Sequence, residues 1–113
     1  MSVSRNEVMC FLMNDESYQF LGNEFSDGNM CNHLIKFVQG HDYLMGMFVY
    51  STAVTIALQK FTRHGVSTLF SKSFVMDNNF KVSYHKIFEE FMFNLKNICI
   101  NKRLKDMEKD FNE

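Results

Sequence analysis

The sequence contains no proline and no tryptophan, and only five of its 113 residues are glycine. Proline interrupts helices, so its absence fits a chain made of helices. The scarcity of glycine excludes the common phosphate-binding loops, since neither GxGxxG nor GxxxxGK[ST] occurs. The chain also lacks an excess of positive charge, because 12 basic residues are balanced by 13 acidic ones. Nucleic-acid binding needs a basic surface that displaces counterions from phosphates, so we expect no nucleic-acid partner.

Cysteine is scarce as well, with three residues, no CxxC pair and no N-glycosylation sequon in the chain. This usage is typical of a cytoplasmic, reducing environment. Cys10, Cys31 and Cys99 lie in apolar segments, so we expect buried, unreactive thiols. The nearest approach to a metal site is Cys31 and His33, with His41 downstream. Zinc usually takes four ligands in paired spacings, so the sequence predicts no metal and no cofactor.

No segment reaches the roughly 20 apolar residues that a membrane-spanning helix needs. The stretch 43–59 carries no charge, but it contains Gly46, Ser51, Thr52 and Thr55. The apolar run from Val8 to Met13 is too short for a signal peptide. We therefore expect no membrane span.

What the chain does contain is an ordinary share of hydrophobic residues, 46%, drawn largely from 13 Phe and 9 Met. A chain of this length buries roughly two thirds of its unfolded surface and forms one domain. We interpret residues 1–113 as a single helical domain.

The spacing of the apolar residues predicts an all-α, compact five-helix globular domain. Ser4 and Glu7 form a capping box that opens the first helix. The residues of the turn-forming sequence 26–29 precede the second helix. The five expected helices cover about 4–13, 30–38, 43–64, 67–75 and 80–110.

The third helix, about 43–64, is expected to lie at the centre of the core because it is apolar on nearly every side. Asp42 is a suitable cap for its start, and Gly65 follows its end. Several residues of this segment are β-branched and also suit strands, so helix and strand both stay open for 47–58. The distance between Gly40 and Gly65, with few turn residues between them, favours the helix.

The last helix, about 80–110, carries two apolar stripes. The first belongs on the core and comprises Tyr84, Ile87, Phe88, Phe91, Met92, Leu95, Ile98 and Cys99. The second repeats at heptad spacing and comprises Phe93, Asn97, Ile100, Leu104, Met107 and Phe111, which we call the seam. A heptad stripe separate from the core face predicts an interface with another helix. Asn97, the only polar member, is of the kind that fixes register and oligomeric state.

Residues 37–43, Phe-Val-Gln-Gly-His-Asp-Tyr, precede the apolar third segment. They resemble the first homology motif of the B-cell-lymphoma-two family of apoptosis regulators, Phe-x-Asp-Gly-x-Asn-Trp-Gly-Arg. Gly40, Asp42 and Tyr43 match the Gly, Asn and Trp, whereas Leu44 and Met45 replace the Gly-Arg. The resemblance covers residues 37–66 and implies a buried central helix and a groove that binds an amphipathic helix.

These patterns favour a non-enzymatic module that binds a partner protein through the seam and forms a homodimer there. We identify no catalytic residue. Two alternatives stay open: a diverged, viral-type helix-groove regulator of apoptosis or innate immunity, as the resemblance implies, and a small enzyme that uses a Cys–His pair.

Overall fold

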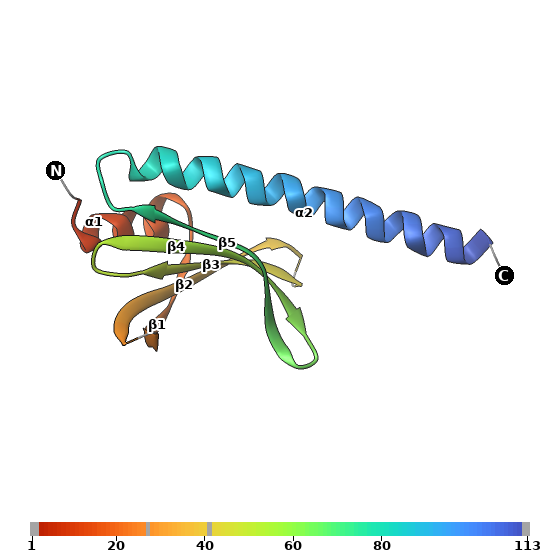
Figure 1. Ribbon diagram of the computed structural model, residues 1–113, viewed down its shortest axis with the longest axis horizontal. Coiled ribbons are helices and arrows are strands. Elements are labelled where there is room, and N and C mark those ends of the chain that lie inside the picture. Colours follow the sequence, from red (N-terminus) through yellow and green to blue (C-terminus); the bar gives the residue numbers. More distant parts are fainter. Residues whose placement is uncertain (1–2, 27, 41, 112–113) are drawn as a thin grey trace.

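The middle of the chain folds into strands in the computed structural model, which describes residues 3–26, 28–40 and 42–111. The side chains of Ser26 and of residues 104–111 lie outside this description. One antiparallel sheet has its strands in the order in which they occur in the sequence. They are β1 (Gln19–Ser26), β2 (Asn29–Gln39), β3 (Tyr43–Val49), β4 (Ala53–Thr62) and β5 (Gly65–Val75) (Figure 1).

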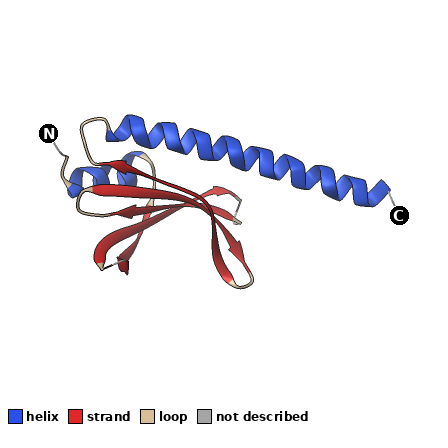
Figure 2. Cartoon of the chain, in the orientation of Figure 1, coloured by secondary structure: helices blue, strands red, loops and turns tan. Residues whose placement is uncertain are grey.

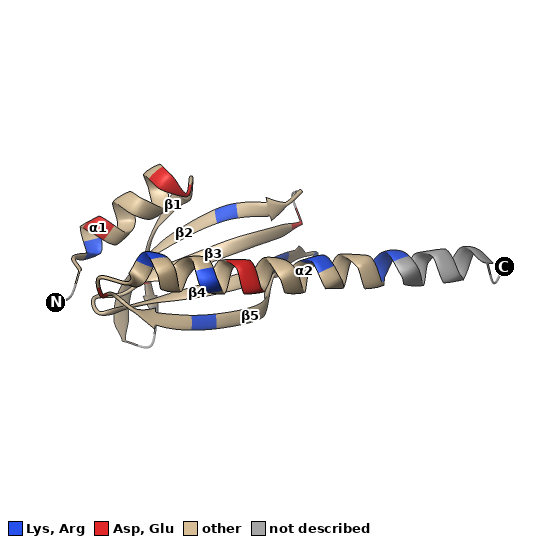
Figure 3. Cartoon of the chain, turned by 90° about the horizontal axis from the view of Figure 1, so that it is seen from above, with Lys and Arg blue, Asp and Glu red and all other residues tan. Residues whose placement is uncertain are grey.

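Helices precede and follow this sheet. At the N-terminal end, α1 (Arg5–Cys10) continues into a π-helical turn, η1 (Phe11–Asp15), and the chain ends in the long α2 (Phe80–Phe111). The Ser4 hydroxyl accepts a hydrogen bond from the Glu7 amide, as the capping box predicts. The helices expected near 4–13 and 80–110 are therefore confirmed. Both pack on the same face of the sheet, which is open on its other side (Figures 2 and 3).

The expected all-α, five-helix domain is wrong. The segment 30–38 lies in β2, and 67–75 lies in β5. The expected central helix, 43–64, is the β3–β4 hairpin together with the turn that leads into β5. The buried helix that the B-cell-lymphoma-two resemblance implied is therefore not present in this segment.

The physical reason lies in the position of β3 in the sheet. Six of its seven residues are buried, because β2 and β4 flank it, the helices cover one face, and the Gln59 side chain of β4 lies over Gly46 on the other. A strand buried on both faces shows no alternation, and its apolar run resembles that of a buried helix. The turn that separates β3 from β4 contains Ser51 and Thr52 and no Gly, Pro, Asn or Asp. The sequence therefore offers little indication that the apolar run is two strands.

The two glycines that were expected to end helices lie instead in hairpin turns. Gly40 follows β2 with a φ of 57°, and Gly65 begins β5 with a φ of 117°. A residue with a side chain rarely adopts these angles, so glycine is favoured at both turns. Glycine in the left-handed region ends a helix and closes a hairpin equally well.

The core lies between the sheet and the helices. Strands β3 and β4 pair so that Met45 faces Leu58 and Met47 faces Ile56, and all four are fully buried on the helix-facing side. On this side the sheet shows the expected alternation of inward and outward residues. The helical contributions to the core are Val8, Phe11, Leu12, Phe80, Tyr84, Ile87, Phe91 and Leu95.

The core face that the sequence predicts for the last helix is confirmed for α2. Four of its eight residues are buried, namely Tyr84, Ile87, Phe91 and Leu95. The others are partly buried, and Phe88, Met92 and Cys99 pack against the core. An ion pair of 2.9 Å between Lys72 of β5 and Glu90 adds a surface contact between the sheet and α2. The partner of this face is a sheet, not the helices that were expected.

Tyr84 joins the N-terminal segment to α2. Its hydroxyl lies 2.8 Å from the hydroxyl of Tyr18, and both side chains are buried. The ring of Phe11 meets the ring of Tyr84 edge to face, with the centroids 5.7 Å apart. Burial raises the pKa of both phenols above its usual range, so both are neutral at physiological pH. Each hydroxyl thus has a partner inside an otherwise apolar environment.

We expect Leu95→Ala to lower the free energy of unfolding by about 2–5 kcal/mol, because truncating a buried leucine leaves a cavity. Leu95 is 1% exposed and is the last buried residue among the described side chains of α2, which end at Arg103. Urea denaturation followed by circular dichroism measures the loss. A loss below about 1 kcal/mol would show that α2 does not pack on the sheet at this point.

We expect Tyr84→Phe alone to cost about 1–3 kcal/mol, since it leaves the Tyr18 hydroxyl buried without a partner. The double variant Tyr18→Phe, Tyr84→Phe removes both hydroxyls and leaves neither without a partner. Its loss of unfolding free energy should therefore be smaller than the sum of the losses of the two single variants. A double-mutant cycle of urea melts measures this coupling. Strict additivity of the two changes would contradict the buried hydrogen bond.

Candidate functional site

The described members of the seam, Phe93, Asn97 and Ile100, lie on the side of α2 that faces away from the sheet. Phe93 is 64% exposed and Ile100 is 44% exposed, although both are large and apolar. Asn97 is exposed between them. The side chains of Leu104, Met107 and Phe111, the other predicted members, lie outside the described residues. The three described members thus have the accessibility that an interface requires.

The geometry of the helix explains this exposure. At about 100° per residue, Phe93 and Ile100 lie roughly opposite Tyr84 and Leu95, at the centre of the core face. A helix that binds the seam would therefore approach α2 from the side opposite the sheet. The next core-face position after Cys99 is occupied by Lys102, which is exposed. The apolar core face of α2 accordingly ends near Cys99, while the heptad spacing of the seam continues to Phe111 in the sequence.

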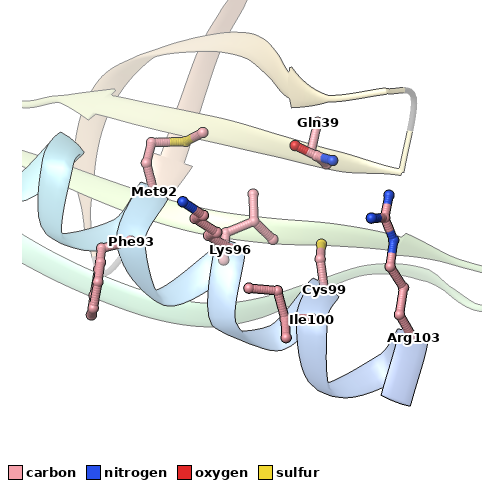
Figure 4. Close-up of a pocket in the computed structure, with 8 residues that line it drawn as sticks. Gln39, Met92, Phe93, Lys96, Cys99, Ile100 and Arg103 are labelled. Atoms are coloured by element: carbon pink, nitrogen blue, oxygen red, sulfur yellow. The ribbon is translucent and has the colours of Figure 1, made fainter. Parts of the chain in front are cut away.

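A cleft of about 620 Å³ lies beside the seam. Gln39 comes from the end of β2, and the remaining lining residues come from α2: Met92, Phe93, Leu95, Lys96, Cys99, Ile100 and Arg103. Figure 4 shows Cys99 and Arg103 directed toward Gln39, whereas Phe93 points away from it. Phe93 and Ile100 belong both to the seam and to the rim of the cleft, so the two features form one continuous surface.

The electrostatics of this surface are one-sided. From residue 91 to residue 103, α2 contains Lys96, Lys102 and Arg103 and no acidic residue. A second hollow, of about 340 Å³, adjoins the cleft and is lined by Lys102, Arg103 and Asp42 among others. No ion pair is formed by Lys96, Lys102 or Arg103 within the described residues. Lys96 and Arg103 thus form a basic flank beside the seam.

The sequence predicted the seam but not the cleft. The sequence did contain one signal for the basic residues of the cleft. Lys96 and Arg103 are seven residues apart, which places both on one flank of the seam. The contribution of Gln39 could not be found, because this segment was interpreted as lying just beyond a helix. Only the observed position of the β2–β3 turn brings Gln39 next to Cys99.

Cys31 and His33, considered above as the nearest approach to a metal site, both lie on β2, on the face turned away from the helices. Nδ1 of His33 lies 2.8 Å from Oε1 of Glu24, and its ring stacks on Phe48. His41 is not among the described residues. Within the described residues no group of three His, Cys, Asp or Glu side chains could hold a metal ion.

The environment of Cys31 argues against a reactive thiolate. Cys31 is 1% exposed, and burial raises the pKa of its thiol, although a hydrogen bond with Tyr50 opposes this effect. No hydrogen bond joins its thiol to His33 in the described part of the chain. The thiolate, not the thiol, is the nucleophile. This arrangement is that of a structural cysteine.

The rest of that face carries both polar pairs and exposed apolar side chains, since Phe37 is 45% exposed and its ring stacks on that of Phe61. Thr55 and Ser73 share a hydrogen bond of 2.8 Å, and the Gln59 side chain donates to the Thr68 hydroxyl. Antiparallel sheets commonly place one face in water, with polar residues on it. We place the candidate site on α2, where Phe93 and Ile100 are exposed and the apolar stripe continues at heptad spacing in the sequence.

Comparisons with known proteins find no family model, no curated protein and no solved structure that matches the chain. Within the part of the chain that the structure describes, no helix is both long and apolar enough to cross a membrane.

The expectation that all three thiols are buried is corrected by the structure, because Cys10 is exposed and Cys99 is partly exposed in the cleft. We expect Cys10 and Cys99 to react with Ellman's reagent in the native protein and Cys31 to react only on unfolding. Peptide mass spectrometry assigns the modified residues, and Cys10→Ser and Cys99→Ser serve as controls. Rapid modification of Cys31 in the native protein would contradict its burial in β2.

Proposed function

We propose that the chain is a non-enzymatic protein–protein interaction module that binds through the seam of α2 and forms a homodimer there. The observation that carries the proposal is the exposure of Phe93 and Ile100 on the side of α2 opposite its core face. Large apolar side chains gathered in water on a small domain are typical of an interaction surface. Packing the seam against a second copy would remove them from water in a self-complementary contact.

The contrast with the preceding turns of the same helix supports the proposal. Most exposed positions there are polar or charged, as at His85, Lys86 and Glu89, and only Val82 is apolar. Core packing does not account for Phe93 or Ile100, because Leu95 and Phe91 already supply the sheet contacts of these turns. An interface would explain why these two exposed positions are apolar.

The alternatives lack a comparable feature. A helix groove of the kind that the resemblance implied needs a buried helix at 43–64, where the chain forms the β3–β4 hairpin. A Cys–His enzyme needs a reactive thiolate beside a base, whereas burial raises the pKa of Cys31, and among the described residues no hydrogen bond joins a cysteine to a histidine. The proposal needs no cofactor and no nucleic acid, and the free thiols of Cys10, Cys31 and Cys99 support a cytoplasmic, reducing location.

We expect the protein to be a dimer in light scattering at about 100 µM, and Phe93→Asp to raise the dimer dissociation constant by roughly thirtyfold or more. A charge at a central aromatic contact costs about 2 kcal/mol or more of binding free energy. Leu104→Asp should act similarly and leave the domain folded. Circular dichroism checks the fold of both variants.

Val82→Asp is the matched control, since Val82 is 69% exposed on the same helix and precedes the seam. This variant should dimerise like the unmodified protein. A monomer at this concentration would exclude the homodimer. If Val82→Asp and Phe93→Asp raise the dimer dissociation constant equally, the interface is not centred on the seam.

A further inference from the structure

We propose that two copies pair in parallel about a two-fold axis, with α2 against α2. In this pairing Asn97 bonds to Asn97 of the second copy, and Arg103 forms an ion pair with Glu108 of the second copy. This inference rests on the proposed function and adds the orientation and register, which the seam alone does not determine.

The position of the seam permits this arrangement. Phe93 and Ile100 lie on the side of α2 opposite its core face, so a second α2 that contacts them leaves each sheet on the outer side of its own helix. The layers would then be sheet, helix, helix, sheet. The two sheets do not compete for the same space, because the core face and the seam lie on opposite sides of α2.

Asn97 favours the parallel orientation. Phe93 and Ile100 occupy d positions of the heptad, and Asn97 occupies an a position between them. In a parallel pair each residue meets its own copy, so two Asn97 amides meet, and an amide both donates and accepts hydrogen bonds. An antiparallel pair that covers the whole seam would place Asn97 opposite Met107, where its amide would have no polar partner.

The charges beside the seam are compatible with the parallel orientation and define its register. Lys96 and Arg103 occupy g positions, and Glu108 occupies an e position, as judged from the sequence since its side chain is not among those described. In parallel pairs a g residue lies near the e residue five positions later in the second helix, which joins Arg103 to Glu108. An antiparallel pair over the whole seam would bring the two Arg103 side chains together, and it would also place Lys96 near Asp110 of the second copy.

The cleft gives this charge pairing a structural basis. Arg103 is exposed, lines the cleft on the flank of the seam, and has no ion-pair partner within the described residues. A second helix on the seam would cover the cleft from the side of Ile100 and bring acidic groups toward Arg103. In the parallel pair the acidic residue that reaches this flank is Glu108 of the second copy, five positions beyond Arg103.

Disulfide trapping tests the orientation. Asn97→Cys, in a background of Cys10→Ser and Cys99→Ser, should form an intermolecular disulfide rapidly when oxidised glutathione is the oxidant. Identical a positions face each other only in the parallel pair; in the antiparallel pair they would lie about 15 Å apart along the axis. Asn101→Cys in the same background is the matched control, because Asn101 is also exposed but lies outside the seam. Non-reducing gel electrophoresis gives the two rates.

The outcomes separate this inference from the proposed function. Faster trapping at position 97 than at position 101 supports the parallel pair. A dimer in light scattering whose position 97 is trapped no faster than position 101 overturns the orientation and leaves the proposed function standing. A monomer overturns both.

Charge reversal tests the register independently. Arg103→Glu and Glu108→Arg should each weaken the dimer roughly five- to tenfold, since each dimer would contain two such pairs. The double variant restores the pair with reversed signs and should return the dissociation constant to near its original value. Failure of the double variant to recover, with the fold intact by circular dichroism, overturns the Arg103–Glu108 pairing.

Discussion

The packing of Tyr84 between the N-terminal segment and the sheet is the contact on which the remaining architecture depends. Its ring meets Phe11 and its hydroxyl meets Tyr18, so one side chain of α2 contacts both the first helical segment and the residue just before β1. The two buried phenol hydroxyls form a hydrogen bond with each other, so each has a partner without a buried water or charge. This contact fixes the start of α2 over the sheet, and the residues that follow, as far as Leu95, complete the same core.

A helix that is fixed along one face has its opposite face determined as well. Because Tyr84, Phe91 and Leu95 point to the sheet, Phe93 and Ile100 have no access to their own core. The candidate surface is therefore a geometric consequence of the core and not a separate element added to it. The same constraint leaves the far face of the sheet, with its paired Thr55 and Ser73, to the solvent.

The secondary structure of the two ends of the chain could be predicted from the sequence, whereas that of the middle could not. The capping box at Ser4 and the long 3.6-residue periodicity from Phe80 are local signals, and both helices were predicted correctly. The apolar run of β3 is ambiguous, because a strand covered on both faces loses its alternation. The turn at Ser51 and Thr52 contains no residue typical of turns, so the sequence did not show that the apolar run forms two strands. The seam was likewise local and predictable, whereas the cleft depends on Gln39, whose place is set by the sheet.

Every strand of the sheet pairs with its neighbour in sequence, and this meander has a consequence for synthesis on the ribosome. Sheets made of successive hairpins have mostly local contacts and form without waiting for distant segments. The strands are complete at Val75, before any residue of α2 has been made. Until α2 emerges, the apolar face with Met47 and Ile56 lacks its main cover. Nascent chains at this stage expose a surface that chaperones bind and that aggregates at high concentration.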